Sequence, residues 1–196
     1  MIQQYAHTIT KEEIANLEVE EFTGKIVLVT NESDCIKAVE YLQQFDQVGF
    51  DTETRPSFRK GQRFLISLMQ ISTEDTCYLF RLNMTGIPQS LENFLKSKKT
   101  EKIGLSLRDD FNAMRKRTAA IPANFIDLQN YVGKFGIEDA SLQKIYAILF
   151  GKKISKGQRL TNWDADILTE SQQKYAALDA WACLKIYKKL NATNEL

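Results

Sequence analysis

Two short acidic patterns, over a hundred residues apart in the chain, constrain its fold more than any other feature. One is Asp51-Thr-Glu53, which follows an apolar run, and the other is Tyr175-Ala-Ala-Leu-Asp179. Residues i and i+2 of a strand share a face, and residues i and i+4 of a helix are neighbours. Each pattern therefore places two polar groups on one face beside apolar residues. Burying an unpaired carboxylate costs several kcal/mol, so the fold has to supply these acids with a cation or another partner.

The order of apolar patterns predicts an α/β fold with a mixed sheet. The polar stretch from Ser72 to Asp75 separates two β-rich runs, which indicates a hairpin. Thr10 and Glu13 fit a capping box that opens a short helix. Strands are predicted at 26–30, 48–53, 63–71, 76–80, 102–105 and 124–128, and the main helices at 33–45, 91–95, 107–117, 141–150 and 170–190. Because strands concentrate early, the helical C-terminal third is expected to cover one face of the sheet.

Length and composition favour a single domain. The chain has 196 residues and three prolines, with no Pro/Gly/Ser-rich linker, so we expect one domain over 26–196, preceded by an N-terminal extension with a short helix over 1–25. The three cysteines are far apart and indicate neither a zinc site nor a disulfide framework. No apolar run approaches the roughly 20 residues of a membrane span, and a cytoplasmic protein is predicted. The net charge of +1 means that polyanion binding would depend on local basic clusters.

A third acidic element lies in the helix predicted at 107–117. Leu107, Phe111 and Met114 define its apolar stripe; Asp110 lies beside that stripe, whereas Asp109 lies almost opposite it. Asp110 is therefore expected to point inward and Asp109 toward water. Simpler interpretations stay open at this point: a solvent-facing strand end for the first acidic pattern, a structural tyrosine–aspartate hydrogen bond for the second, and an acid placed by the helix dipole for the third.

Taken together, the acids favour a site for divalent cations. The only histidine is His7, in the N-terminal extension, so the histidine and thiolate clusters that zinc prefers are missing. Oxygen ligands alone suit hard cations such as Mg²⁺ or Mn²⁺. Two strand rises separate Asp51 from Glu53 by roughly 6.6 Å, which suits a pair of ions about 3.5–4 Å apart. Water activated by metal is then the natural nucleophile.

These residues resemble the DEDD superfamily of 3′–5′ exonucleases, in the subgroup with a tyrosine in its last motif that includes Werner-type and ribonuclease D-type enzymes. The first motif matches Gly49-Phe-Asp-Thr-Glu53, the second runs from Lys102 to Asp110, and the third lies within 168–181. The resemblance extends from about Ile26 to Leu190. It implies an RNase H-like fold, with a mixed five-stranded sheet flanked by helices.

The resemblance also implies roles for the site residues. Asp51, Glu53 and Asp179 would hold a first Mg²⁺ or Mn²⁺ ion, with Asp51 bridging to a second ion that Asp110 supports through water, and Tyr175 would orient the attacking water. The implied activity is a two-metal-ion 3′–5′ exonuclease that releases nucleoside 5′-monophosphates. DNA is favoured as the nucleic-acid partner. Ribonuclease D-like trimming of RNA 3′ ends and a non-catalytic nucleic-acid-binding domain are the alternatives.

Two basic segments are candidates for phosphate contacts, although solvated loops would look the same. They contribute Arg55, Arg59, Lys60 and Arg63 in one segment, and Lys153, Lys156 and Arg159 in the other. Phe58 is a candidate for base stacking. For the remaining residues near the motifs we expect structural roles: Phe64 in the core, Trp163 against the last helix, Asp127 as a helix cap, and Gln70 in an internal hydrogen bond.

Overall fold

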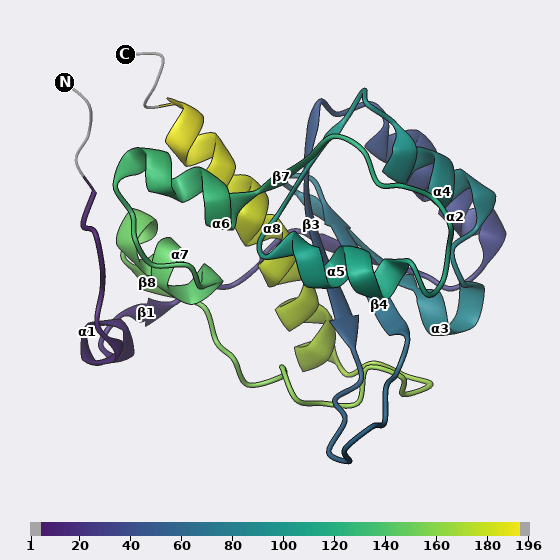
Figure 1. The fold of residues 1–196 in the computed structure, drawn as a ribbon, viewed down its shortest axis with the longest axis horizontal. Coiled ribbons are helices and arrows are strands. Elements are labelled where there is room, and N and C mark those ends of the chain that lie inside the picture. Colours follow the sequence, from purple (N-terminus) through teal and green to yellow (C-terminus); the bar gives the residue numbers. More distant parts are fainter. Residues whose placement is uncertain (1–4, 193–196) are drawn as a thin grey trace.

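Six strands form one mixed sheet at the centre of the computed structural model, which describes residues 5–192 (Figure 1). The strand order is β2-β5-β4-β3-β6-β7. The pairs β2·β5, β3·β6 and β6·β7 are parallel, whereas β4 runs antiparallel to both of its neighbours. The mixed α/β class is thereby confirmed. Residues 1–4 and 193–196, at the outer ends of the two predicted segments, lie outside the described residues.

Each strand predicted from the apolar patterns is present, so the sheet has one strand more than the five that the family resemblance implied. The two edge strands are β2, which pairs with β5, and the short β7, which pairs with β6. The third predicted strand begins later than expected, because Arg63 to Leu65 belong to the preceding loop. The observed strands are β2 (Lys25–Val29), β3 (Gln47–Thr54), β4 (Ile66–Ser72), β5 (Thr76–Arg81), β6 (Glu101–Gly104) and β7 (Phe125–Asp127).

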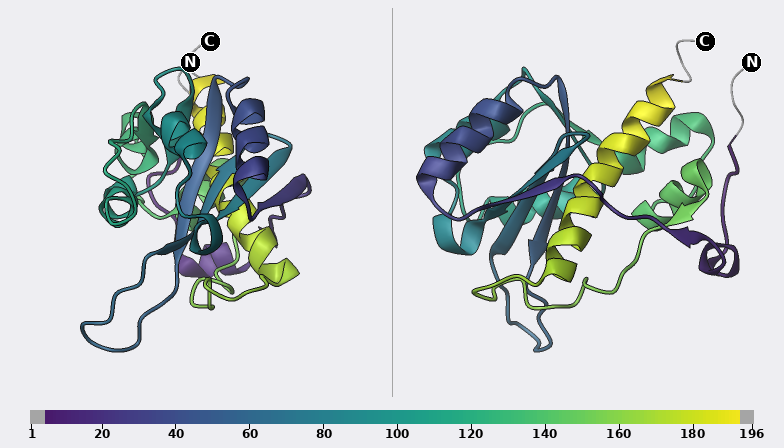
Figure 2. Two further views of the ribbon diagram at one scale, coloured as in Figure 1. Left: turned by 90° about the vertical axis from the view of Figure 1, so that its right-hand side faces the viewer. Right: turned by 180° about the vertical axis from the view of Figure 1, so that it is seen from behind.

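Helices bury apolar residues against the sheet in two separate clusters. One cluster joins α2 (Glu32–Leu42), α4 (Gln89–Lys96) and α5 (Leu107–Met114) to strand residues such as Val48 and Phe50. The other contains α7 (Leu142–Phe150) and α8 (Glu170–Ala192), the long helix that crosses the sheet in Figure 2, right. The C-terminal region therefore covers a face of the sheet, as predicted. Shorter helices are α3 (Leu82–Thr85), α6 (Leu128–Tyr131) and the 3-10 turn η1 (Val132–Phe135).

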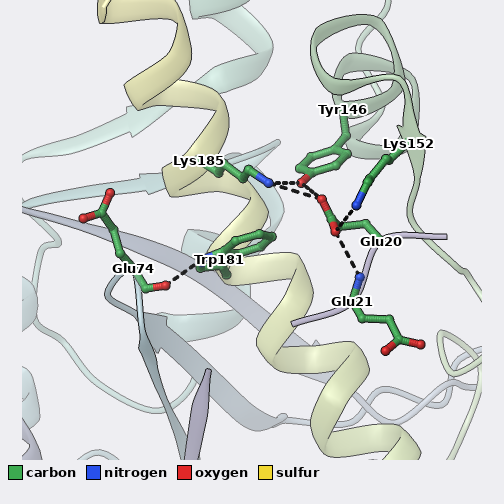
Figure 3. A network of polar contacts seen from close by, with 7 residues as sticks. All are labelled: Glu20, Glu21, Glu74, Tyr146, Lys152, Trp181 and Lys185. Carbon is green, nitrogen blue, oxygen red and sulfur yellow. Dashed lines mark hydrogen bonds and ion pairs between the residues drawn. The ribbon is translucent and has the colours of Figure 1, made fainter. Parts of the chain in front are cut away.

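The N-terminal segment is attached to the domain by a small parallel sheet and a buried ion network. Its helix α1 (Lys11–Ala15) has the predicted capping box, and β1 (Glu18–Val19) pairs with β8 (Lys152–Lys153). Glu20 follows β1 and is only 8% exposed. Its carboxylate accepts a hydrogen bond from Tyr146 and lies 3.2 Å from the amines of both Lys152 and Lys185 (Figure 3). This network ties the segment to α7, β8 and α8.

Two long loops lie side by side at one end of the sheet. Residues 55–65 connect β3 to β4 and project from the body of the domain, and residues 154–169 connect β8 to α8 beneath the sheet (Figures 1 and 2). The second loop is anchored where Arg81, at the end of β5, donates hydrogen bonds to the backbone of Ala165 and Asp166. Over residues 5–192, we find no helix with the length and apolar character that a membrane crossing requires.

Candidate active site

Strand β3 directs Asp51 and Glu53 toward helix α8. The same face of β3 carries Gly49, two residues earlier, and Gly49 allows the helix to approach closely. A Cβ atom at this position would lie 1.9 Å from the carbonyl oxygen of Ala180, in the middle of α8. Any side chain there would push the helix, and with it the neighbouring Asp179, away from the strand. The glycine of the first motif is therefore required by packing.

Helix α8 completes a group of three carboxylates. Asp179 is buried, whereas Asp51 and Glu53 are half-buried, and one oxygen of each lies within 4.8 Å of the others. Asp179 and Tyr175 are one helical turn apart on α8, so the phenol lies beside the acids. The structure thus brings together the two patterns from which the sequence interpretation began. The roles of these residues in binding metal stay a prediction.

Asp110 approaches the same site from α5 but is separate from the group of three. Thr52, whose side chain points away from Asp51 and Glu53 because successive strand residues alternate, donates a hydrogen bond to Asp110. Asp110 is partly buried and Asp109 is exposed, as the helical stripe predicted. Sequence reasoning missed Thr52, although the alternation along the motif was the signal that would have found it.

Burial and mutual repulsion strongly perturb the protonation of these acids. Burial raises the pKa of Asp51 well above its usual range, and the charges of Glu53 and Asp179 raise it further. Burial raises the pKa of Glu53 to about 9, and the charges of Asp179 and Asp110 contribute to the rise. Burial raises the pKa of Asp179 to about 7, although a hydrogen bond with Tyr175 acts in the opposite direction. Burial likewise raises the pKa of Asp110 to about 6. Such raised values mark a cluster that lacks enough positive charge.

Tyr175 is held as a hydrogen-bond donor. Its ring lies 6.0 Å from that of Trp163, which is fully buried and packs against α8 as predicted. Burial raises the pKa of the Tyr175 hydroxyl, and the negative charges of Asp179 and Glu53 raise it further. The phenol therefore keeps its proton at neutral pH. It can orient a water molecule or a phosphate oxygen, but it is unsuited to act as a base.

The acids line a cavity of about 430 Å³, and two basic side chains line it as well. Lys156 and Arg159, from the 154–169 loop, line it together with Asp51, Glu53, Asp179 and Tyr175. The charge of Arg159 lowers the pKa of Glu53, and that of Lys156 lowers the pKa of Asp179. Because neither effect outweighs burial, both carboxyl groups retain raised pKa values. Two predicted phosphate-binding residues are thus located beside the acids.

The other predicted basic residues lie elsewhere. Arg55 and Arg59 line a second cavity, between the two long loops. Lys60 and Arg63 are exposed on the 55–65 loop and do not line either cavity. The Lys153 amine donates a hydrogen bond to the carbonyl oxygen of Ala15, so the pairing of β8 with the N-terminal segment turns it away from the acids. The position of Lys153 therefore indicates a structural role and not a contact with the substrate.

Three neighbouring residues test the structural roles expected from the sequence. Asp127 is confirmed as a helix cap: it accepts hydrogen bonds from the backbone at the start of α6 and also at the start of α5. The hydrogen bond expected for Gln70 is wrong, because its buried amide has no partner among the described residues. Phe64 was expected in the core but is only partly buried; its ring lies 4.9 Å from the Arg55 guanidinium.

Comparison with known proteins identifies the family to which the chain belongs. The family model described as a 3′–5′ exonuclease matches residues 26–195. The chain belongs to the 3′–5′ exonuclease family. Its curated relatives include the bifunctional 3′–5′ exonuclease/ATP-dependent helicase WRN of Mus musculus, 34% identical over 89% of this chain, and a 3′–5′ exonuclease of Arabidopsis thaliana, 30% identical over 73%. The chain spans 13% of the first of these relatives and 52% of the second.

Solved structures show the same exonuclease fold. The EXO domain of Aedes aegypti Nibbler aligns with a TM-score of 0.75 and 21% identity, covering 97% of this chain and 93% of that domain. Escherichia coli RNase D aligns with a TM-score of 0.77 and 21% identity, covering 88% of this chain and 45% of that enzyme. The RNase H-like architecture implied by the sequence motifs is confirmed by these neighbours of the family.

Proposed function

We propose that this domain is a two-metal-ion 3′–5′ exonuclease that hydrolyses phosphodiester bonds at the 3′ end of nucleic acid and releases nucleoside 5′-monophosphates. The observation that carries the proposal is the group of three carboxylates within 4.8 Å of one another. Over residues 5–192, none of the three has an ion pair within 4.0 Å. Acids that repel one another in a buried site are stabilised by a divalent cation.

The donor set fits Mg²⁺ or Mn²⁺. Asp51, Glu53 and Asp179 offer only carboxylate oxygens, the ligands that hard cations prefer. Asp110 is a fourth carboxylate close enough to repel Glu53, which supports a second ion on that side. When bound, the ions supply an acidic water as nucleophile and stabilise the leaving 3′ oxygen.

The chain's own side chains complete the chemistry. Tyr175 keeps its proton and donates a hydrogen bond, which orients the attacking water or a phosphate oxygen. Lys156 and Arg159 lie at the cavity wall, where their charges attract a phosphate and stabilise the additional negative charge of the transition state. Three residues act through others. The lack of a side chain at Gly49 sets the position of α8, the Thr52 hydroxyl that of Asp110, and the Trp163 ring that of Tyr175.

DNA is the proposed preferred substrate. Support comes from a relative named for DNA, the DNA polymerase I of Aquifex aeolicus, which is 28% identical over 86% of this chain, and from the mouse exonuclease/helicase, which at 34% is more similar than a ribonuclease D of Gluconacetobacter diazotrophicus at 27%. RNA is the second candidate, because one solved neighbour, Trypanosoma brucei RNase D, is described in complex with RNA U12. The three cysteines of the domain are buried and unpaired, which supports a reducing compartment such as the cytoplasm.

Digestion of end-labelled oligonucleotides tests the proposal. Deoxy and ribo oligonucleotides of one sequence, labelled at either end, are incubated with Mg²⁺, Mn²⁺ or a chelator. We expect 5′-labelled strands to shorten stepwise, with nucleoside 5′-monophosphate as the product and faster turnover of the deoxy strand. Chelator should abolish the reaction. Products with 3′-phosphates, shortening from the 5′ end, or unchanged strands under every condition would contradict the proposed activity.

A further inference from the structure

A second cavity lies directly beside the acidic one. It has a volume of about 500 Å³ and is formed between the 55–65 loop and the 154–169 loop. Glu53 in the first cavity is two residues from Arg55 in the second, and Arg159 in the first is adjacent to Leu160 in the second. A polymer whose end occupies the acidic cavity can therefore continue into this one. We call it the Phe58 pocket, lined by Arg55, Pro56, Phe58, Arg59, Gln62, Phe64, Leu160 and Asn162.

Exposed apolar side chains line this pocket. Phe58 is 81% exposed and Leu160 is 66% exposed, although apolar side chains of this size normally gain stability by being buried. They lie on opposing loops and face the same cavity. The volume falls within the roughly 300–1,000 Å³ typical of small-ligand pockets, and a nucleotide is a ligand of that size. A flat aromatic ligand would cover the Phe58 ring.

The charge of the pocket selects an anionic ligand. Between Thr54 and Thr73 the chain has four basic residues and no acidic ones, although its net charge is only +1. The Arg55 guanidinium lies over the Phe64 ring, 4.9 Å from its centroid, which orients the guanidinium at the pocket wall. Arg59 lines the same pocket. Arginines beside an exposed aromatic ring match a phosphate next to a base.

Hydrogen bonds hold one wall of the pocket against the rest of the domain. Gln172, at the start of α8, donates hydrogen bonds to the Thr161 hydroxyl and to the carbonyl oxygen of Asn162. The same stretch is held at its far side by Arg81. Leu160 and Asn162 are therefore held relative to the helix that carries Asp179. A nucleotide bound against this wall would have a defined distance from the acids.

From these observations we propose that the Phe58 pocket is a subsite that stacks an unpaired base of a single-stranded 3′ end, one or two nucleotides before the terminal one. The inference depends on the proposed exonuclease function and makes it more specific. It assigns Phe58 and Leu160 to base contact and Arg55 and Arg59 to the adjacent phosphates. It also predicts a preference for unpaired 3′ ends, because a base in a duplex is stacked on its neighbours and is not available to Phe58.

Length dependence of KM is the first test. With deoxy oligonucleotides of two, four and six residues, the native protein should show a KM that falls as the strand becomes long enough to reach the pocket. Phe58→Ala should raise KM for the hexamer by about tenfold, so that KM changes little with strand length. Phe58→Trp should restore the native dependence of KM on length. Ile121→Ala is the matched control, because Ile121 is also 81% exposed, in the segment after α5; it should behave as native.

A spectroscopic readout separates stacking from other effects. In the Asp51→Asn variant, a single-stranded oligonucleotide carries the fluorescent base 2-aminopurine at the first, second or third position from the 3′ end. We expect Phe58 to quench the fluorescence at the second or third position, and Phe58→Ala to relieve the quenching. A hexamer KM in Phe58→Ala equal to the native value, with equal quenching, would overturn the subsite while leaving the exonuclease function intact. Quenching without hydrolysis by native protein would retain the subsite and refute the proposed function.

Discussion

Two carboxylates of this domain are equally buried and yet have opposite surroundings. Glu20 and Asp179 are each 8% exposed, and each lies beside a tyrosine hydroxyl. Burial alone would raise the pKa of Glu20, but hydrogen bonds from Tyr146, Lys185 and Lys152 outweigh it and lower the pKa to about 2 (Figure 3). Asp179 lies among other acids instead, and burial raises its pKa to about 7.

The contrast distinguishes a structural ion network from the proposed cation site. Glu20 finds all of its positive charge inside the chain, so its network is complete and holds the N-terminal segment in place. The cluster of Asp51, Glu53 and Asp179 has no such compensation among residues 5–192, and in the proposed function a cation from solution supplies it. The repulsion among these acids is offset by packing between α8 and β3, which are in close contact at Gly49. Burial therefore does not distinguish the two clusters, whereas the balance of charge does.

Neutralising one acid of the incomplete cluster should have the largest effect. We expect Asp51→Asn to lower kcat at least about a thousandfold, equivalent to about 4 kcal/mol of barrier, because the amide cannot hold the cation. The metal-free variant should be at least as stable as the native protein, since folding no longer buries an ionisable group whose charged form is unfavourable there. Turnover of a labelled oligonucleotide and urea unfolding measure the two effects. Near-native turnover would remove Asp51 from the ligand set.

Neutralising the acid of the complete cluster should affect stability instead. Glu20→Gln should lower the free energy of unfolding by about 2 kcal/mol, less than the usual cost of breaking a buried pair because both lysines reach solvent. Urea denaturation with an unchanged m-value would measure this loss. Glu170→Gln is the control, because Glu170 pairs with Lys174 on the exposed start of α8, and its unfolding midpoint should equal the native one. An equal midpoint for Glu20→Gln would show that the network is not needed for stability.

Each of the two clusters includes a tyrosine, and removing its hydroxyl should have a different effect in each. Tyr175→Phe should lower kcat about tenfold, about 1.4 kcal/mol, with little change in Mn²⁺ affinity, because the phenol orients water and does not bind the ion. Tyr146→Phe should leave kcat unchanged and lower the unfolding midpoint. Steady-state kinetics and Mn²⁺ titration distinguish the two variants. Loss of Mn²⁺ binding in Tyr175→Phe would assign its hydroxyl a ligand role.

The pH dependence of stability should have opposite signs in the two clusters. In metal-free protein, Glu53 has a pKa raised from 4.5 to about 9, so its contribution is complete below pH 4.5 and is lost as the pH rises toward 9. Glu20 has a pKa lowered from 4.5 to about 2, so its contribution is complete above pH 4.5 and is lost as the pH falls toward 2. The midpoints of urea unfolding, measured between pH 3 and 9, report both contributions to stability. Glu53→Gln should reduce the loss of stability above pH 4.5 without removing it, because Asp51 and Asp179 also have raised pKa values. Glu20→Gln should reduce the loss below pH 4.5 only.

The features that were predicted from sequence are those with a local period. Alternation along β3 placed Asp51 and Glu53 on one face, and the helical period paired Tyr175 with Asp179. The apolar runs also indicated six strands, and the count of five came from the resemblance rather than from the residues. In each case the signal lies within a few neighbouring residues, where backbone geometry dictates the direction of side chains.

Apart from Thr52, the features that were missed depend on contacts between distant residues. Tyr146 is 126 residues from Glu20 in the chain, and no local pattern marks Glu20 as buried. The same holds for Lys153, which turns toward Ala15, whereas Lys156, only three residues later, lines the acidic cavity as a candidate for phosphate contact. The pairing of β1 with β8 places Lys153 beside Ala15, and that pairing has no period in the sequence.

Calorimetric titration of Mn²⁺ into the metal-free protein tests the central claim most directly. Carboxyl groups with raised pKa values must lose their protons before they bind a cation. The native protein should therefore bind Mn²⁺ more tightly at pH 8 than at pH 6 and release protons as it does so, while Asp51→Asn should show no comparable binding and Glu20→Gln should match the native protein. Absence of Mn²⁺ binding by the native protein at either pH, or equal binding by Asp51→Asn, would contradict the claim that these acids form a cation site.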